Sequence, residues 1–117
     1  MMLADELEKH VGVLKEQNLL VIVEGKKDRA ALNALGIMNV VTLKQPLFAV
    51  VEQVVGQTKE CVILTDLDGE GRKLYARLSS DLQRFGVKIN NKFRHFLFKE
   101  TQVRQIEGLT TFLERNT

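Results

Sequence analysis

Two apolar runs that each end in acids decide the fold of this chain: LLVIVEGKKD at residues 19–28 and CVILTDLDGEGR at residues 61–72. Consecutive apolar residues rich in β-branching are typical of strands buried on both faces of a parallel sheet. Residues 19–23 and 61–65 are therefore predicted as inner strands. Each run stops abruptly at a carboxylate, Glu24 in the first and Asp66 in the second.

Helical patterns alternate with these strands. Residues 3–16 place apolar side chains three or four positions apart, which is typical of one helix face. Glycine at position 36 or 86 suits the end of a helix, and Pro46 suits the first turn of one. The further helices are expected at residues 30–36, 46–56 and 74–86, and a second, shorter strand at 40–43. This alternation predicts a parallel α/β sheet with helices on both faces.

The pattern is weaker after Gly86. Residues 87–89 are predicted as a fourth short strand, and 92–98 as either a helix capped by Asn91 or a strand. A last helix is expected from Gln105. The expectation is a single α/β domain over residues 1–117 with about four strands and about five helices. Its parts are a core at about 19–90, an N-terminal helix at 3–16 and a C-terminal helical extension at 91–115.

The composition is that of an ordinary globular protein. The chain has 117 residues, of which 44% are hydrophobic and 27% charged, so it can build one hydrophobic core but not two. No apolar stretch approaches the roughly 20 residues that span a bilayer, and the charged N-terminus is unlike a signal peptide. We therefore expect a cytoplasmic protein that does not enter a membrane. Cys61 lies in an apolar run, which favours a buried, inert thiol.

Charge is distributed unevenly along the sequence. Residues 1–70 carry 7 basic and 11 acidic side chains, a balance of −4, whereas residues 71–117 carry 10 basic and 4 acidic, a balance of +6. A basic half can attract the phosphates of a nucleic acid, although an ordinary solvated helix surface has the same composition.

The acids at the strand ends are the candidate site. Ligands of open parallel sheets bind at the carboxyl ends of the strands, where Glu24 and Asp66 stand. Asp68 lies two residues past Asp66, so an extended backbone directs both carboxylates to the same side. Three carboxylates at one point repel each other unless a cation offsets their charge. Oxygen-only ligands favour Mg²⁺ or Mn²⁺, and the three acids are the predicted metal ligands.

Each acid also has a simpler explanation. An acid after a strand is commonly the point where the chain meets water, and Glu24 alone would be interpreted in this way. Asp68 suits the N-cap of the helix that follows, and Asp28 suits a cap or a first-turn position favoured by the helix dipole.

The pairing of the two motifs, Glu-Gly-Lys-Lys-Asp after one strand and Asp-Leu-Asp-Gly-Glu-Gly after another, resembles the toprim family over residues 19–89. This is the Rossmann-like metal-binding domain of topoisomerases, bacterial primases, recombination mediators and some nucleases. The first motif is similar to that of nucleases that mature ribosomal RNA. The chain's size and the RQIEGL at residues 104–109 are similar to small stand-alone archaeal toprim proteins.

The resemblance implies that Asp66 and Asp68 bind Mg²⁺ and that Glu24 is a further ligand or the general acid/base. Gly25 and Gly71 would leave room for a phosphate or a neighbouring backbone to approach, and Asp28 would support the site. The adjacent basic residues would contact substrate phosphates or, equally, form salt bridges with the acids; these are Lys26, Lys27, Arg72 and Lys73. Glu70 matches an additional acid of some toprim sequences, or is a solvent-facing first-turn residue.

Three kinds of function fit these residues. One is a metal-dependent nuclease or phosphotransferase acting on phosphodiesters of RNA or DNA. A second is a non-catalytic module that binds nucleic acid or a partner protein in repair, replication or RNA maturation, alone or as a homo-oligomer. A third is a nucleotide-binding protein. The topoisomerases of the family need a catalytic tyrosine on a separate domain. Tyr75, the only tyrosine of this chain, lies within a predicted helix of the single domain, so a complete topoisomerase is excluded. No basic strand rich in aromatic residues predicts base stacking, and His10 and His95 have no predicted role.

Overall fold

The computed structural model describes residues 3–115, which form a four-stranded sheet in the order β2-β1-β3-β4. The ends of the predicted domain, residues 1–2 and 116–117, lie outside the described part. All three strand pairings are parallel, with Val21 opposite Val40 and Leu20 opposite Cys61. The predicted α/β class is therefore correct. The strands are β1 (Leu20–Val23), β2 (Val40–Thr42), β3 (Glu60–Ile63) and β4 (Lys88–Ile89).

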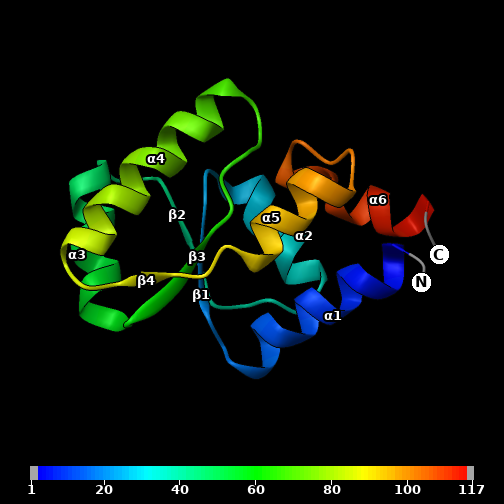
Figure 1. The fold of residues 1–117 in the computed structure, drawn as a ribbon, viewed down its shortest axis with the longest axis horizontal. Coiled ribbons are helices and arrows are strands. Elements are labelled where there is room, and N and C mark those ends of the chain that lie inside the picture. Colours follow the sequence, from blue (N-terminus) through cyan, green and yellow to red (C-terminus); the bar gives the residue numbers. More distant parts are fainter. Residues whose placement is uncertain (1–2, 116–117) are drawn as a thin grey trace.

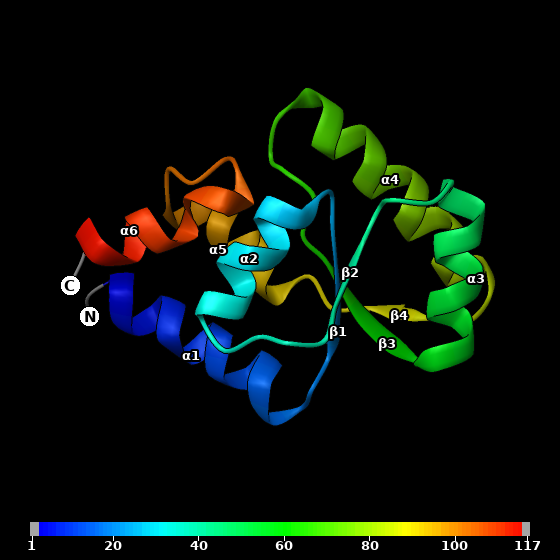
Figure 2. The same ribbon diagram turned by 180° about the vertical axis from the view of Figure 1, so that it is seen from behind.

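The helices lie in two layers on either side of this sheet, as Figures 1 and 2 show. One layer holds α3 (Leu47–Gln57) and α4 (Gly69–Arg84). The other holds α1 (Leu3–Glu16), α2 (Lys26–Ala34), α5 (Lys92–Glu100) and α6 (Leu109–Arg115), with the 3-10 helix η1 (Ile106–Gly108) leading into α6.

Alternate residues of β1 enter two separate cores. Val21 and Val23 pack with α1, α2 and α5, whereas Leu20 and Ile22 pack with α3 and α4. All four side chains are at most 1% exposed. A strand buried on both faces has no polar positions, which explains the unbroken apolar run in the sequence.

The weakly patterned C-terminal part also becomes regular. Residues 92–100 are helical, so the alternative of a strand at 93–98 is wrong. Phe93, Phe96 and Leu97 lie three and four positions apart and are buried against the same core. Asn91 precedes the helix as predicted, but it is the side chain of Asn90 that accepts a hydrogen bond from the Lys92 N–H, at 3.1 Å. Residues 3–115 contain six α-helices instead of about five.

The strand order places the two acidic motifs at a crevice. The chain passes from β1 into α2 on one face of the sheet, and from β3 into α4 on the opposite face. The strands β1 and β3 are neighbours, but the loops that follow them lead to opposite faces of the sheet. Ligands of such sheets bind in the space that opens between two loops of this kind. Among residues 3–115, no helix combines the length and apolar character that crossing a membrane requires.

Candidate functional site

Glu24 and Asp66 meet at the carboxyl ends of the neighbouring strands β1 and β3. The backbone N–H of Asp66 donates a hydrogen bond to Oε2 of Glu24 at 2.7 Å. Both side chains are half-buried. The sequence predicted this juxtaposition, which needs only that the two strands be adjacent and parallel.

Residues from the C-terminal part of the chain complete this edge. The N–H of Ile106 donates to Oδ1 of Asp66 at 2.9 Å, and the N–H of Leu67 donates to the carbonyl of Arg104 at 2.6 Å. Residues 103–109 thus fold back over the loop that follows β3, and Ile106 and Leu109 are fully buried. We call this stretch the return segment. It fixes the orientation of the Asp66 carboxylate.

Asp68 and Asp28 both cap helices. Oδ1 of Asp68, which is exposed, accepts from the N–H of Gly71 at 2.8 Å and so caps α4. Oδ2 of Asp28, which is buried, accepts from the N–H of Gly25 at 3.0 Å at the start of α2. Asp68 is the N-cap of α4 as predicted, and Asp28 takes the predicted first-turn position in α2, where its carboxylate binds the N-cap backbone. The same hydrogen bonds fix the two carboxylates at positions from which their charges act on Glu24.

The acids influence each other's ionisation. Burial raises the pKa of Glu24, and the negative charges of Asp66, Asp28 and Asp68 add to this; the hydrogen bond from the Asp66 N–H acts in the opposite direction. The pKa of Asp28 is also raised, first by burial and then by the charges of Asp66 and Glu107, against the N–H of Gly25. A cation at this edge would relieve the repulsion.

The donor set suits a hard divalent cation, but the three predicted ligands do not form a closed cage. Among residues 3–115, no three Asp, Glu, His or Cys side chains lie close enough to hold an ion together. Glu24 and Asp66 are adjacent, whereas Asp68 faces its own helix. Mg²⁺ commonly takes only one or two carboxylates and keeps water and phosphate oxygens as its other ligands. The Glu24–Asp66 pair fits a site of that type.

The basic residues beside the acids are not neutralised by them. Lys26, Lys27, Arg72 and Lys73 are all exposed, and in the described part of the chain none forms an ion pair. The ion pair found there, between Arg77 and Asp81, lies farther along α4. The structure of residues 3–115 therefore does not contain the salt bridges that were the alternative prediction for these four basic residues. Glu70 is exposed in the first turn of α4, as its simpler interpretation predicts.

The two glycines of the motifs differ in what surrounds them. A Cβ at Gly71 would overlap the backbone of Asp66, so glycine is required for α4 to pass this close to the end of β3. A Cβ at Gly25 would meet nothing within 4 Å, and its φ of −149° suits any residue. The prediction that a neighbouring backbone comes close is therefore correct for Gly71, whereas the space in front of Gly25 is open.

Sequence reasoning missed Arg94. Its guanidinium is buried and donates to the carbonyls of Thr65 at 2.7 Å and of Ile63 and Asp66 at 3.4 Å. It also lies over the ring of Tyr75, 4.5 Å from the centroid. Arg94 therefore holds the end of β3, from which Asp66 projects. The one signal in the sequence is a charged residue on the apolar side of α5.

Comparison with known proteins fits this geometry. The Toprim domain model matches residues 19–101, which hold both acidic motifs. The chain belongs to the toprim domain family. A UPF0292 protein of Methanocaldococcus jannaschii is 32% identical over 100 residues, covering 81% of this chain and 78% of that protein. A UPF0292 protein of Methanosarcina barkeri is 35% identical over 117 residues, covering 95% and 80%.

Solved structures share the toprim fold. A protein from Aquifex aeolicus superposes with a TM-score of 0.79 at 29% identity, covering 88% of this chain and 94% of that one. The zinc-binding and RNA polymerase domains of the primase from the same organism give a TM-score of 0.55 at 24% identity. They match 92% of this chain but only 28% of the primase chain. The predicted resemblance to small archaeal toprim proteins and to primases is confirmed.

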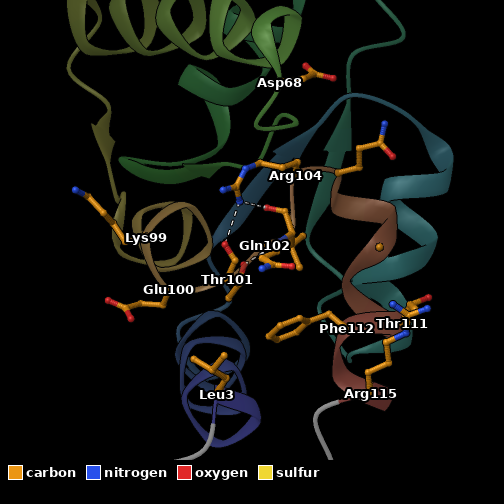
Figure 3. A pocket seen from close by; sticks show the side chains of 13 residues that line it. Leu3, Asp68, Lys99, Glu100, Thr101, Gln102, Arg104, Thr111, Phe112 and Arg115 are labelled. Carbon is orange, nitrogen blue, oxygen red and sulfur yellow. Dashed lines mark hydrogen bonds between the residues drawn. The ribbon is translucent and has the colours of Figure 1, made fainter.

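The toprim match ends at residue 101, yet the return segment beyond it contacts Asp66. This segment also walls a groove of about 950 Å³ that runs between α5 and α6 (Figure 3). Asp68 lies at one end of the groove and Leu3 at the other, and Arg104 projects into its middle. Arg104 donates to the carbonyls of Thr101 and Val103 at 3.1 and 3.0 Å. The groove therefore reaches the acidic motif at Asp68 and is lined mostly by residues 99–115.

Proposed function

We propose that this toprim protein is a Mg²⁺- or Mn²⁺-dependent enzyme that acts on the phosphodiesters of a nucleic acid, as a nuclease or phosphotransferase. The observation that carries the proposal is the hydrogen bond from the Asp66 N–H to the Glu24 carboxylate at neighbouring strand ends, beside basic side chains that form no ion pair within residues 3–115. Family membership supports it, since toprim domains typically bind metal and process nucleic acids. One of the two Aquifex aeolicus structures with this fold is a primase.

Asp66 would hold the metal with Glu24 as a further ligand, and Asp68 would join them or bind a metal-held water from the N-cap position of α4. A bound divalent ion supplies a counter-charge for the scissile phosphate and lowers the pKa of a water or hydroxyl. The hydrogen bonds from the Asp66 and Ile106 N–H groups would keep Glu24 and Asp66 in fixed orientations. Fixed ligands reduce the reorganisation that the reaction needs.

If Glu24 is not itself a ligand, Asp66 and Asp68 would hold the metal and Glu24 would move the proton. Its carboxylate sits in a partly buried position among three other acids, which favours its protonated form more than water does. A carboxylate of this kind is a better general base and acid near neutral pH than an exposed one. The N–H of Asp66 binds one oxygen of the Glu24 carboxylate, and the second oxygen of Glu24 would face the substrate.

The exposed basic residues would bind the phosphates that flank the reacting one. Lys26 and Lys27 open α2, and Arg72 and Lys73 lie at the end of the first turn of α4 and the start of the second, so the two pairs stand on either side of the acids. Gly25 leaves open space between them, and Asp28 fixes the backbone of that turn. Glu70 would be an additional acid at the rim. We expect the protein to work in the cytoplasm.

A second candidate is a non-catalytic toprim module that binds nucleic acid or a partner protein. The observation that favours it is Asp68, whose carboxylate is engaged as a helix cap, so that three acids do not converge. The same basic residues would then bind phosphates without any reaction. Metal-dependent turnover separates the two candidates.

The test is a titration of Mg²⁺ and Mn²⁺ into the wild-type protein and an Asp66→Asn/Asp68→Asn variant, with labelled RNA and DNA present. We expect binding and cleavage or strand transfer by the wild type only. Asp81→Asn is the matched control, because Asp81 is on the same helix but pairs with Arg77 instead of facing the site. Metal binding without turnover would favour the module, and absence of metal binding would exclude the proposed site.

A further inference from the structure

A small pocket opens between α4 and α5 beside the acidic edge. Its volume is about 300 Å³, at the small end of the range for small-molecule sites. The side chains that matter for its chemistry are Arg72, Tyr75, Asn91, Arg94, His95 and Phe98. Leu67, which follows Asp66, forms part of its wall, so the pocket shares a loop with the acidic motif.

The walls of this pocket are flat, π-rich groups. Arg94 lies over Tyr75 at 4.5 Å, and Arg72 lies over Phe98 at 4.8 Å from guanidinium carbon to ring centroid. Arg104 contacts the same phenylalanine at 5.6 Å. Aromatic rings and guanidinium planes are the surfaces on which proteins stack unpaired bases. Phe98 is 40% exposed, so a ring system can reach it without unfolding α5.

The rim of the pocket is polar. Asn91 and His95 are exposed; Asn91 is the N-cap of α5 and His95 lies one turn farther along this helix. Their side chains offer both donors and acceptors, which is what the edge of a nucleobase requires. The hydrophobic and polar parts of the pocket thus match the face and the edge of one base.

We propose that this pocket holds one unpaired base of a single nucleic-acid strand whose backbone crosses the acidic edge. The proposal rests on the function proposed above and adds the form of its substrate. A base inside a double helix has both faces covered and cannot enter. The cavity is also too small for a base pair together with its backbone.

The neighbouring cations give the strand its path. Arg72 follows Asp68 by one helical turn and lines the pocket, so a phosphate between the acids and the base would meet its guanidinium. Arg104 contacts Phe98 on one side and projects into the groove of Figure 3. The rest of the strand therefore follows that groove, past Lys99 and toward Arg115.

The experiment uses a short oligothymidine strand in which one base at a time is replaced by fluorescent 2-aminopurine. Ca²⁺ replaces Mg²⁺, and gel analysis checks that the strand stays intact. In the wild-type protein, fluorescence at one position should report stacking. Phe98→Ala should remove that signal and weaken strand binding about tenfold, the usual size of one base–aromatic stack. Phe98→Trp, which keeps a flat ring, should restore both.

Phe85→Ala is the matched control. Phe85 is 60% exposed at the far end of α4 and does not line the pocket, so its removal should leave binding unchanged. An abasic nucleotide at the reporting position should cost at least as much as Phe98→Ala, because it also removes the contacts of the base edge, and adding Phe98→Ala to it should cost nothing further.

Three results would overturn the proposal: Phe98→Ala binding as tightly as wild type, a fully paired duplex binding as well as the single strand, or a mononucleotide doing so. The outcome is separable from that of the proposed enzyme. A pocket signal without cleavage in Mg²⁺ would leave this inference standing and remove the enzymatic function. Cleavage without a pocket signal would do the reverse.

Discussion

The first turn of α4 passes against the backbone of Asp66, and Gly71 is the residue at the contact. Its carbonyl also accepts a hydrogen bond from the buried Thr65 hydroxyl at 2.6 Å. The helix that carries Asp68 and Arg72 is therefore fixed to the end of β3 through a residue without a side chain. A displacement here would move both motifs together.

Gly71→Ala should lower the free energy of unfolding by roughly 3 kcal/mol, the upper range for inserting a methyl group into a packed site. The reason is that its Cβ collides with backbone atoms, which cannot rotate away. Gly69→Ala, at a position with open space in the same turn, should leave stability unchanged or slightly higher. Urea unfolding of both variants measures this. Equal stability of the two variants would show that α4 is free to move away from the backbone of Asp66.

Arg94 acts at the same scale on the strand end. Arg94→Met should cost about 2–3 kcal/mol, because the buried carbonyls of Thr65 and Asp66 lose a charged donor. Arg94→Lys should recover only part of this, since an ammonium cannot reproduce the planar fork. Arg84→Met, at the exposed end of α4, is the comparison and should change stability by less than about 0.5 kcal/mol. A fully stable Arg94→Met protein would contradict the role assigned to Arg94.

Among the elements outside the toprim match, which include α1 and α6, the return segment is the one that contacts the acidic motif. It lies beyond the toprim match, yet it hydrogen-bonds to Asp66 and Leu67 and buries Ile106. The two layers of helices form the fold, while this short stretch determines how the loop after β3 is closed.

Ile106→Ala should destabilise the protein by about 3 kcal/mol, the usual cost of a large-to-small change at a fully buried site. It should also speed amide exchange at Leu67, whose N–H donates to the carbonyl of Arg104. Gln102→Ala, exposed near the same segment, serves as control. Unchanged exchange at Leu67 in a destabilised Ile106→Ala protein would mean that the segment does not hold the loop.

The elements also show what local sequence can predict. Apolar runs are enough to predict β1 and β3 and, through parallel geometry, the meeting of Glu24 with Asp66. The choice of a helix over a strand at residues 92–100 depended on burial against a core that local periodicity does not reveal.

Contacts between distant parts of the chain were not predictable in this way. The partners of Arg94 are backbone carbonyls 28 to 31 residues away, and every residue has a carbonyl. Likewise, the aromatic groups near the site come from two helices, α4 and α5, so a search for one aromatic-rich basic strand could not find them. Whether Asp68 caps a helix or binds a metal is a choice between two roles with the same sequence signal.

At the scale of the whole molecule, the acidic edge gives stability a pH dependence. Glu24 and Asp28 have raised pKa values in the folded protein, so the folded state takes up protons at a higher pH than the unfolded state. Above the folded pKa values, both states are ionised and the folded state bears the full cost of burial and repulsion. As the pH falls toward the ordinary carboxyl value, 4.5 for Glu24, this cost is relieved.

Metal-free protein should therefore gain stability when the pH is lowered from neutral toward about 5, and Glu24→Gln should reduce that gain. Mg²⁺ should raise the melting temperature at neutral pH, and less so at the lower pH, because ion binding competes with protons. Thermal unfolding across this range, in EDTA and in Mg²⁺, measures both effects. A melting temperature that ignores Mg²⁺ at every pH would count against a metal at this edge.

The hydrogen bond from Ile106 to Asp66 spans 40 residues of chain, and this has a consequence during protein synthesis. A ribosome adds about 5–20 residues per second, so β3 emerges on the order of a few seconds before the residues that close over it. All four strands precede the return segment in the chain, so each is synthesised before the residue that donates to the Asp66 carboxylate. The acidic edge is therefore the last part of the sheet's ligand-binding end for which all residues become available.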